Sequence, residues 1–353
     1  MKYPLLAGLL LLCSNLSAQT HTSTYSPGVT PEGASFCLPK TAIRISVLTE
    51  KRNYQPGEFA IYAQRYLRLS NVSTEPSVVH RVISVRQTAV GVADTTKMFS
   101  VKFNNKTSAI NVALSEDGTL RAVNVQPEEA PLPAPFQPGP RLRLPDPHQL
   151  MNQEILAAGS MAKMAQLTAQ EIYDLRDNRS LLIKGQADFM PHDGEQMKMM
   201  LQQMDLQDRA LTSLFSGTTT CDTVEHIFYI CPSTDIQNQT LFRFSKHFGM
   251  VDADDMSGVA YNISVTDLKT VPRTPENAKR KKSENGLYYN VPGRMRSTIT
   301  CGADILAHNE FPAAQFGNME LLSGDLFNKH YGTRIWLNPV TGSIDKLEAE
   351  QPK

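Results

Sequence analysis

The chain has 353 residues, of which 41% are hydrophobic and 20% are charged, and 35 lysines and arginines balance 35 aspartates and glutamates. This composition excludes a chain that is disordered throughout, because such chains combine low hydrophobicity with high net charge. Zero net charge gives no overall electrostatic attraction to nucleic acid or to an anionic membrane. We therefore expect a folded protein of about two domains, at roughly 150 residues each, with no nucleic-acid partner.

The first residues have the pattern of an export signal. Lys2 precedes an apolar run from Leu5 to Leu12, and small residues before Gln19 offer a cleavage site. The sequence predicts a signal peptide over residues 1–18 and export to the periplasm or the outer membrane. Lipidation at Cys13 is the alternative, although lipoprotein processing favours a small residue where Leu12 stands. The run is shorter than the ~20 apolar residues that cross a bilayer, so we expect no membrane-spanning segment.

Export would place the remaining cysteines in an oxidising compartment. The candidates for disulfides are Cys37, Cys221, Cys231 and Cys301, which allow three pairings. Val224–Ile230 is predicted to be a strand, and a strand rises ~3.3 Å per residue. Cys221 and Cys231, at its two ends, should therefore lie too far apart to pair with each other. Four separate buried thiols are the alternative.

Residues 19–126 are predicted to form an N-terminal β module. Apolar and polar residues alternate around Ile43–Val47, Val82–Val85 and Val112–Leu114, the last just before a turn with the sequence Glu-Asp-Gly. Between the first two of these strands, apolar residues from Phe59 to Leu67 recur at helical spacing. We expect one short amphipathic helix there, packed on the sheet.

Residues 127–147 contain eight of the 22 prolines. Proline removes backbone hydrogen bonds from helices and sheets and favours extended polyproline conformation. The sequence therefore predicts a semi-rigid linker at this point. A peptide ligand for a domain with an aromatic groove is the alternative.

Residues 148–217 are predicted to be helical, because apolar residues recur there at helical spacing. A capping box at Thr168–Glu171 is expected to open a second helix that ends at Gly185. Asp193 offers the N-cap of a third helix, which runs to the end of the region. The last two helices should form an antiparallel hairpin.

Residues 218–353 are predicted to form a C-terminal β module. The motif Gly-x-x-Phe-x-Leu-Pro at 33–39 recurs as Gly-x-x-Tyr-x-Val-Pro at 286–292. Each flank then contains an Ala-Gln pair, at 63–64 and 314–315, and ends in a hairpin. The predicted fold class is α+β, with two mostly antiparallel β modules and a helical hairpin insertion between them. The matches favour an internal duplication of the β module.

The sequence lacks the motifs of the common enzyme families, including the G-x-S-x-G elbow, the H-E-x-x-H helix and the Walker loop. We expect no cofactor, and no catalytic residue can be assigned. Asp252, Asp254 and Asp255 offer oxygen ligands for calcium, with a simple surface turn as the alternative. The basic run Lys279–Lys282 is interpreted as a solvated loop.

Six short segments spread over the chain carry a resemblance to a known family. They are Tyr25–Thr30, Phe36–Thr41, Tyr62–Leu69, Gly91–Thr95, Glu171–Arg176 and Asn338–Gly342. Together they resemble domain of unknown function 4831, a family of exported Bacteroidales proteins. The resemblance covers nearly the whole mature chain and implies export to the cell envelope. It implies no known activity and brings no catalytic residues.

The leading hypothesis is a non-catalytic binding or scaffold component of the periplasm or outer membrane, with another envelope protein as its partner. The alternative is a secreted hydrolase that acts on glycan or peptide, with carboxylates or histidines converging from distant segments. A cavity with two or more titratable groups of perturbed pKa would distinguish them. The sequence leaves the oligomeric state open.

Overall fold

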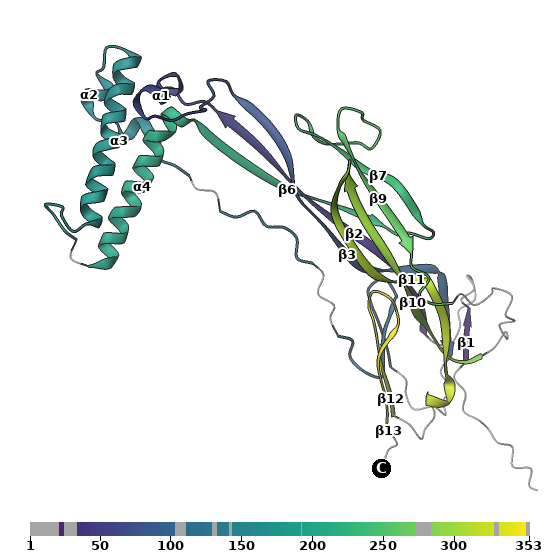
Figure 1. Ribbon diagram of the computed structural model, residues 1–353. Coiled ribbons are helices and arrows are strands. Elements are labelled where there is room, and N and C mark those ends of the chain that lie inside the picture. Colours follow the sequence, from purple (N-terminus) through teal and green to yellow (C-terminus); the bar gives the residue numbers. More distant parts are fainter. Residues whose placement is uncertain are drawn as a thin grey trace, which may run out of the picture.

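The computed structural model describes residues 21–24, 34–102, 111–128, 133–140, 143–191, 193–272, 284–327 and 332–350. They form an elongated molecule with three parts (Figure 1). A β body lies at one end. A long twisted ribbon, which we call the arm, extends from it and consists of the paired residues 43–55, 77–89 and 218–230. A group of helices, which we call the head, lies at the far end of the arm.

Within the described residues, the strands form a nine-stranded and a four-stranded sheet. The large sheet has the order β6-β2-β3-β1-β10-β9-β7-β8, with β11 also paired to β10, and the small sheet has the order β13-β12-β5-β4. The strands are β1 (His21–Thr24), β2 (Ala34–Gln55), β3 (Ser77–Lys102), β4 (Val112–Leu114), β5 (Leu120–Val123), β6 (Thr218–Ile230), β7 (Ile236–Ser245), β8 (Gly249–Val251), β9 (Val259–Asp267), β10 (Glu284–Cys301), β11 (Asp304–Ser323), β12 (Gly332–Leu337) and β13 (Ile344–Glu350).

The helices are α1 (Ala63–Tyr66), α2 (Gln153–Leu156), α3 (Met161–Ile183) and α4 (Gly194–Ser216), with 3-10 turns at Ala60–Tyr62, Pro147–Leu150 and Gly324–Phe327. The predicted cap of α4 is confirmed, because the Asp193 carboxylate accepts the Gln196 N–H at 2.7 Å. The predicted start of a helix at Thr168 is wrong. Ser160 caps α3, and the Thr168 hydroxyl donates to the Met164 carbonyl inside this helix.

The predicted α+β class is confirmed, because antiparallel sheets flank the helical hairpin α3–α4. Strands from the two sides of this hairpin also pair with each other. In the large sheet β2 pairs with β6 and β1 with β10, and in the small sheet β5 pairs with β12. The two flanks are therefore joined through both sheets.

The long hairpins β2–β3 and β10–β11 carry the same irregularity. Residues 94–97 lie opposite Leu38 alone, and residues 314–317 lie opposite Pro292 alone. These bulges coincide with the repeated motif that the sequence predicts.

A second pair of contacts repeats in the same way. Cys37 donates its backbone N–H to the Gly118 carbonyl at 2.9 Å, and Asn290 donates its own to the Gly342 carbonyl at 3.0 Å. Cys37 and Asn290 occupy the same position of the repeated motif. Each glycine lies in the turn of the short hairpin that follows, β4–β5 or β12–β13. These contacts support the internal duplication.

One of the sequence matches offered for the duplication is wrong. Ala63–Gln64 begins helix α1, whereas Ala314–Gln315 lies in the bulge of β11. The Gln315 amide accepts the Thr41 N–H at 3.0 Å and donates to the Thr41 carbonyl at 2.8 Å. This tie between the two long hairpins has no counterpart in α1.

The apolar side chains gather in three main clusters. One lies between the base of the arm and strands β7, β9, β10 and β11, one between the two sheets, and one in the head. Fully buried members are, in that order, Ile45 and Ile263, Leu120 and Ile335, and Phe59 and Phe215.

The predicted helix at 59–67 is confirmed as a 3-10 turn followed by α1. The expectation that it packs on the sheet is wrong, because Phe59, Ala63 and Leu67 are buried against α3 and α4. This segment connects β2 to β3 at the far end of the arm, where the helices provide the apolar surface.

Candidate functional site

The arm is held together by ion pairs that cross its strands. Glu50 of β2 accepts hydrogen bonds from Arg81 of β3 at 2.6 Å and from Arg52 at 2.8 Å. The Glu50 side chain is only 11% exposed. Its hydrogen bond to Arg81 is the main reason why its pKa lies below the usual value.

The proline-rich linker forms a strap beside the arm. We use this name for residues 133–140 and 143–146, which are neither helix nor strand. The Phe136 N–H donates to the carboxylate of Glu225 in β6 at 2.9 Å. The strap is therefore tied to the edge strand of the arm by a bond to a charged group.

The carboxylate of Glu225 has further partners. It accepts a hydrogen bond from the Ser46 hydroxyl, and Arg44 lies 3.4 Å away. The bond from the Phe136 amide, followed by the bond from Ser46, holds the pKa of Glu225 below its usual value. The ionised carboxylate is thus the form that joins the strap, β2 and β6.

We expect Glu225→Ala to release the strap, because the Phe136 N–H loses its acceptor. Hydrogen exchange at the Phe136 amide should accelerate at least tenfold. In the native chain the protection should persist while the pH falls through the usual glutamate range. It should disappear at lower pH, where the Glu225 carboxylate takes up a proton.

The matched control is Glu310→Ala, which removes a carboxylate that pairs with Arg296 at 2.7 Å, away from the strap. Unchanged exchange at Phe136 in the Glu225 variant would contradict the role of this carboxylate.

A cavity of ≈ 650 Å³ lies where α4 passes into β6. Leu144 of the strap forms one side, and Arg209 of α4 and Thr218–Thr220 of β6 form others. Gly217 permits the sharp change from helix to strand with a φ of 74°. The described lining includes neither histidine nor cysteine. Its hydroxyls and guanidinium groups are suited to bind a polar ligand by hydrogen bonds.

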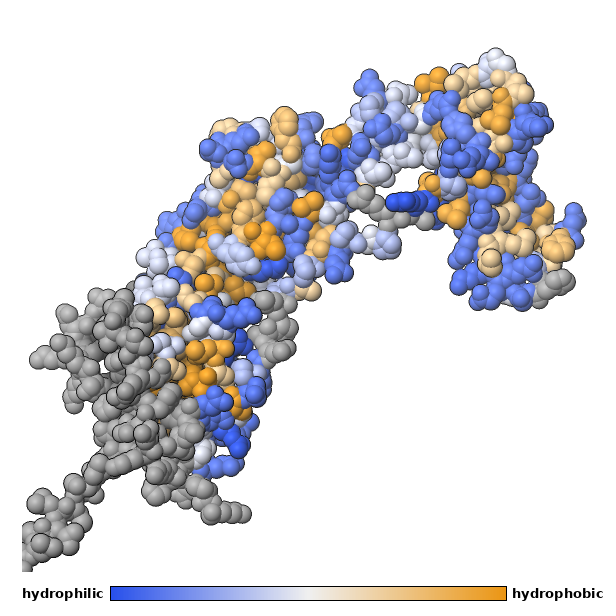
Figure 2. Space-filling model, turned by 180° about the vertical axis from the view of Figure 1, so that it is seen from behind, coloured by the Kyte–Doolittle hydropathy of each residue, from blue (hydrophilic) through white to orange (hydrophobic). Residues whose placement is uncertain are grey.

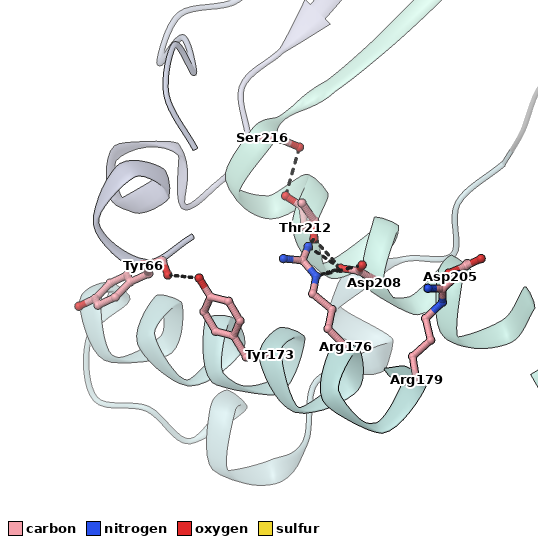
Figure 3. A network of polar contacts seen from close by, with 8 residues as sticks. All are labelled: Tyr66, Tyr173, Arg176, Arg179, Asp205, Asp208, Thr212 and Ser216. Carbon is pink, nitrogen blue, oxygen red and sulfur yellow. Dashed lines mark hydrogen bonds and ion pairs between the residues drawn. The ribbon is translucent and has the colours of Figure 1, made fainter. Parts of the chain in front are cut away.

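Polar contacts join α3 and α4 beside this cavity (Figure 3). Arg176 binds Asp208 with Nη2 at 2.8 Å and Nε at 3.1 Å, and Asp208 also accepts the Thr212 hydroxyl at 2.9 Å. Arg179 pairs with Asp205 at 2.8 Å. The arginines and the aspartates are each three positions apart, so each pair lies on one face of its helix. This matched spacing is a signal in the sequence for the register of the two helices, and none of the predictions above uses it.

The free end of the α3–α4 hairpin, which we call the tip, exposes apolar side chains. They are Leu181, Ile183, Phe189, Met190 and Met199. Phe189 is 62% exposed and Met199 is 68% exposed. Beyond Ile172, Leu182 is the one residue of α3 that the structure describes as buried. The tip therefore contributes little to the core of the head.

A second cavity, of ≈ 550 Å³, brings two carboxylates together in the β body. Asp235 and Asp267 line it with Lys269. The Asp235 carboxylate accepts the Asp267 N–H at 2.8 Å, and the Asp267 carboxylate accepts the Lys269 N–H at 2.8 Å. Both groups thus fix the backbone around the end of β9, as expected for structural carboxylates.

The acidic residues proposed for calcium lie in an exposed turn between β8 and β9. The Asp255 N–H donates to the Asp252 carbonyl at 3.1 Å, and the Asp255 carboxylate accepts the Ser257 N–H at 2.9 Å. This second bond is the main reason why the pKa of Asp255 is lowered. In the described part of the chain, no three or more His, Cys, Asp or Glu side chains are grouped to hold a metal ion.

The four cysteines that the structure describes are free thiols. Cys37 is buried, Cys301 is half-buried, and Cys221 and Cys231 are exposed. Cys221 lies opposite Arg52 of β2, whereas Cys231 follows β6 at its other end, so the strand separates them as predicted. Burial raises the pKa of the Cys37 thiol. The disulfide pairings stay predictions.

The predicted signal peptide, Cys13 and the basic run Lys279–Lys282 lie outside the described residues. None of the helices that the structure describes combines the length and the apolar character needed to cross a membrane.

Comparison with family models finds a match over most of the chain. The family model "Domain of unknown function (DUF4831)" matches residues 32–345. No curated protein and no solved structure matches the chain. The matched range includes the arm, the head and all the strands except β1 and most of β13. The chain belongs to the DUF4831 family.

Proposed function

We propose that this protein is an exported, non-catalytic binding or scaffold component of the periplasm or outer membrane. Its partner is another envelope protein, which it contacts through the tip of the head. The observation that carries this proposal is the set of exposed apolar side chains at the tip. Exposed apolar side chains that gather at one place mark interaction sites more often than scattered ones do.

The construction of the head supports this role. Ion pairs join the middle of α3 to α4, while the buried side chains of the hairpin concentrate where it meets α1. The hairpin can therefore hold its shape without burying the apolar residues of the tip. An apolar helical end of this kind fits a hydrophobic groove of another protein.

The charges around the tip favour a protein partner over an anionic membrane. Lys184 and Lys198 are accompanied by Asp188, Asp193 and Glu195. Interfacial helices that bind anionic lipid have an excess of lysine and arginine. The mixed charges here provide no such excess.

Site-specific photo-crosslinking in the producing cells tests the proposal. We expect a crosslinker at Phe189 or Met199 to capture one and the same protein. A crosslinker at Phe248, which is 72% exposed on the β body, should not capture it. Identical products from all three positions would reject the tip as the binding surface.

The captured protein is then purified for a direct measurement. Phe189→Ser should weaken its binding to the intact chain at least tenfold, and Phe248→Ser should leave binding unchanged. Phe189 is 62% exposed and Phe248 is 72% exposed, so we expect each change to have only a small effect on the free energy of unfolding. Equal affinity of the two variants would contradict the proposal.

A further inference from the structure

We propose that the outer edge of β6 binds an extended polypeptide segment of a partner as an added strand. β6 pairs with β2 along its whole length, from Ile230 opposite Ile43 to Thr218 opposite Gln55. No strand in the described part of the chain pairs with the other edge of β6. In an antiparallel pair, every second residue directs its N–H and C=O groups away from the partner. β6 thus presents a row of donors and acceptors at strand spacing.

The strand β6 itself lacks three of the features that protect edge strands, although the strap lies beside it. Protected edges carry lysine, proline or a bulge. The β6 sequence contains no lysine or proline, and its register with β2 is uninterrupted. Val224 and Tyr229 are 52% and 63% exposed, so apolar side chains flank the free backbone groups. An added strand would cover both.

The strap determines what can reach this edge. It lies close to β6 at two places, because Phe136 binds Glu225 and Leu144 lines the same cavity as Thr218–Thr220. The space-filling view shows an opening between the strap and the arm (Figure 2). In Figure 1, β6 is the strand of the arm nearest to the strap.

This arrangement selects one kind of occupant. A second copy of the chain would have to displace the strap before its own sheet could pair with β6. A single extended segment can lie in the opening while the strap stays tied to Glu225. The hydroxyl-rich cavity at the start of β6 would then receive one end of the segment.

The binding of a strand at β6 does not depend on the proposed role of the tip. The two surfaces lie on different elements, and variants at Phe189 or Met199 leave the β6 edge intact. Failure of either proposal can therefore be recognised separately.

The test uses the intact mature chain and a synthetic peptide with the sequence of residues 43–55, the segment of β2 that already pairs with β6. The expected result is saturable binding with protection from hydrogen exchange confined to residues 218–230. A peptide of the same sequence with every backbone nitrogen methylated should lose binding at least tenfold, because it cannot donate to the edge. Equal binding of the two peptides would overturn the proposal.

A variant pair provides the second test. Ile227→Lys places a positive charge on the edge strand, opposite a peptide that contains arginine and lysine, and should weaken binding about tenfold. Ile83→Lys on β3, at a similarly exposed position, should leave binding unchanged. No protection of β6 at about 1 mM peptide, an affinity of only about 4 kcal/mol, would also overturn the proposal.

Discussion

Phe215→Ala should destabilise the head by about 3–5 kcal/mol, the usual cost of removing a buried aromatic side chain. Phe215 is fully buried, and its ring centre lies 5.3 Å from that of Phe59. The contact joins the end of α4 to the connection between β2 and β3. The cluster that contains it is separate from the clusters of the β body. We therefore expect the loss to be concentrated in the helices.

Two optical signals can separate the head from the β body. Far-UV circular dichroism reports the helices, and fluorescence reports the single tryptophan, Trp336, in β12 of the small sheet. In a denaturant titration, Phe215→Ala should shift the helical transition and leave that of Trp336 in place. Phe248→Ala should shift neither, because Phe248 is largely exposed. Equal shifts of both signals would show that the head and the body unfold as one unit.

Asn290→Leu should destabilise the β body by about 2–4 kcal/mol. Asn290 is fully buried, and its side-chain amide donates to the carbonyls of Pro39 at 2.9 Å and Thr341 at 2.8 Å. Leucine has a similar volume but leaves two buried carbonyls without these donors. The amide joins β2, opposite the bulge of β3, to the turn between β12 and β13.

The same denaturant titration measures the effect of Asn290→Leu, and here the two transitions should respond in the opposite way. The Trp336 transition should move to lower denaturant, while the helical transition of the head stays in place. Asn290→Asp should be no less destabilising, because it replaces the donor with an acceptor. An unchanged Trp336 transition in the leucine variant would contradict the role of this amide.

Local signals in the sequence predicted the elements that depend on neighbouring residues. The Asp193 cap, the stop at Gly217 and the strand at Val224–Ile230 are all present. Thr168 misled because a capping box inside a longer helix has the same sequence as one at its start. Its hydroxyl binds the preceding turn instead.

The candidate surfaces were harder to predict because they depend on distant pairing. Among the described strands, β6 pairs with β2 alone, which makes it an edge strand. β2 precedes β6 by more than 160 residues, so no local pattern reveals this. The role of Glu225 depends on Phe136, which is 89 positions away. By contrast, the paired spacing of Arg176 and Arg179 with Asp205 and Asp208 was available in the sequence. It predicts the antiparallel register of α3 and α4 that the structure has.

The antiparallel pairing of the arm also determines how the molecule carries mechanical load. Hydrogen bonds between antiparallel strands run perpendicular to the strands. A pull on the head along the arm would load the bonds between β2, β3 and β6 in shear, so many would have to break together. The strap provides a second connection from the head to the β body, parallel to the arm. The arm and strap together should transmit tension to the β body instead of unzipping one bond at a time.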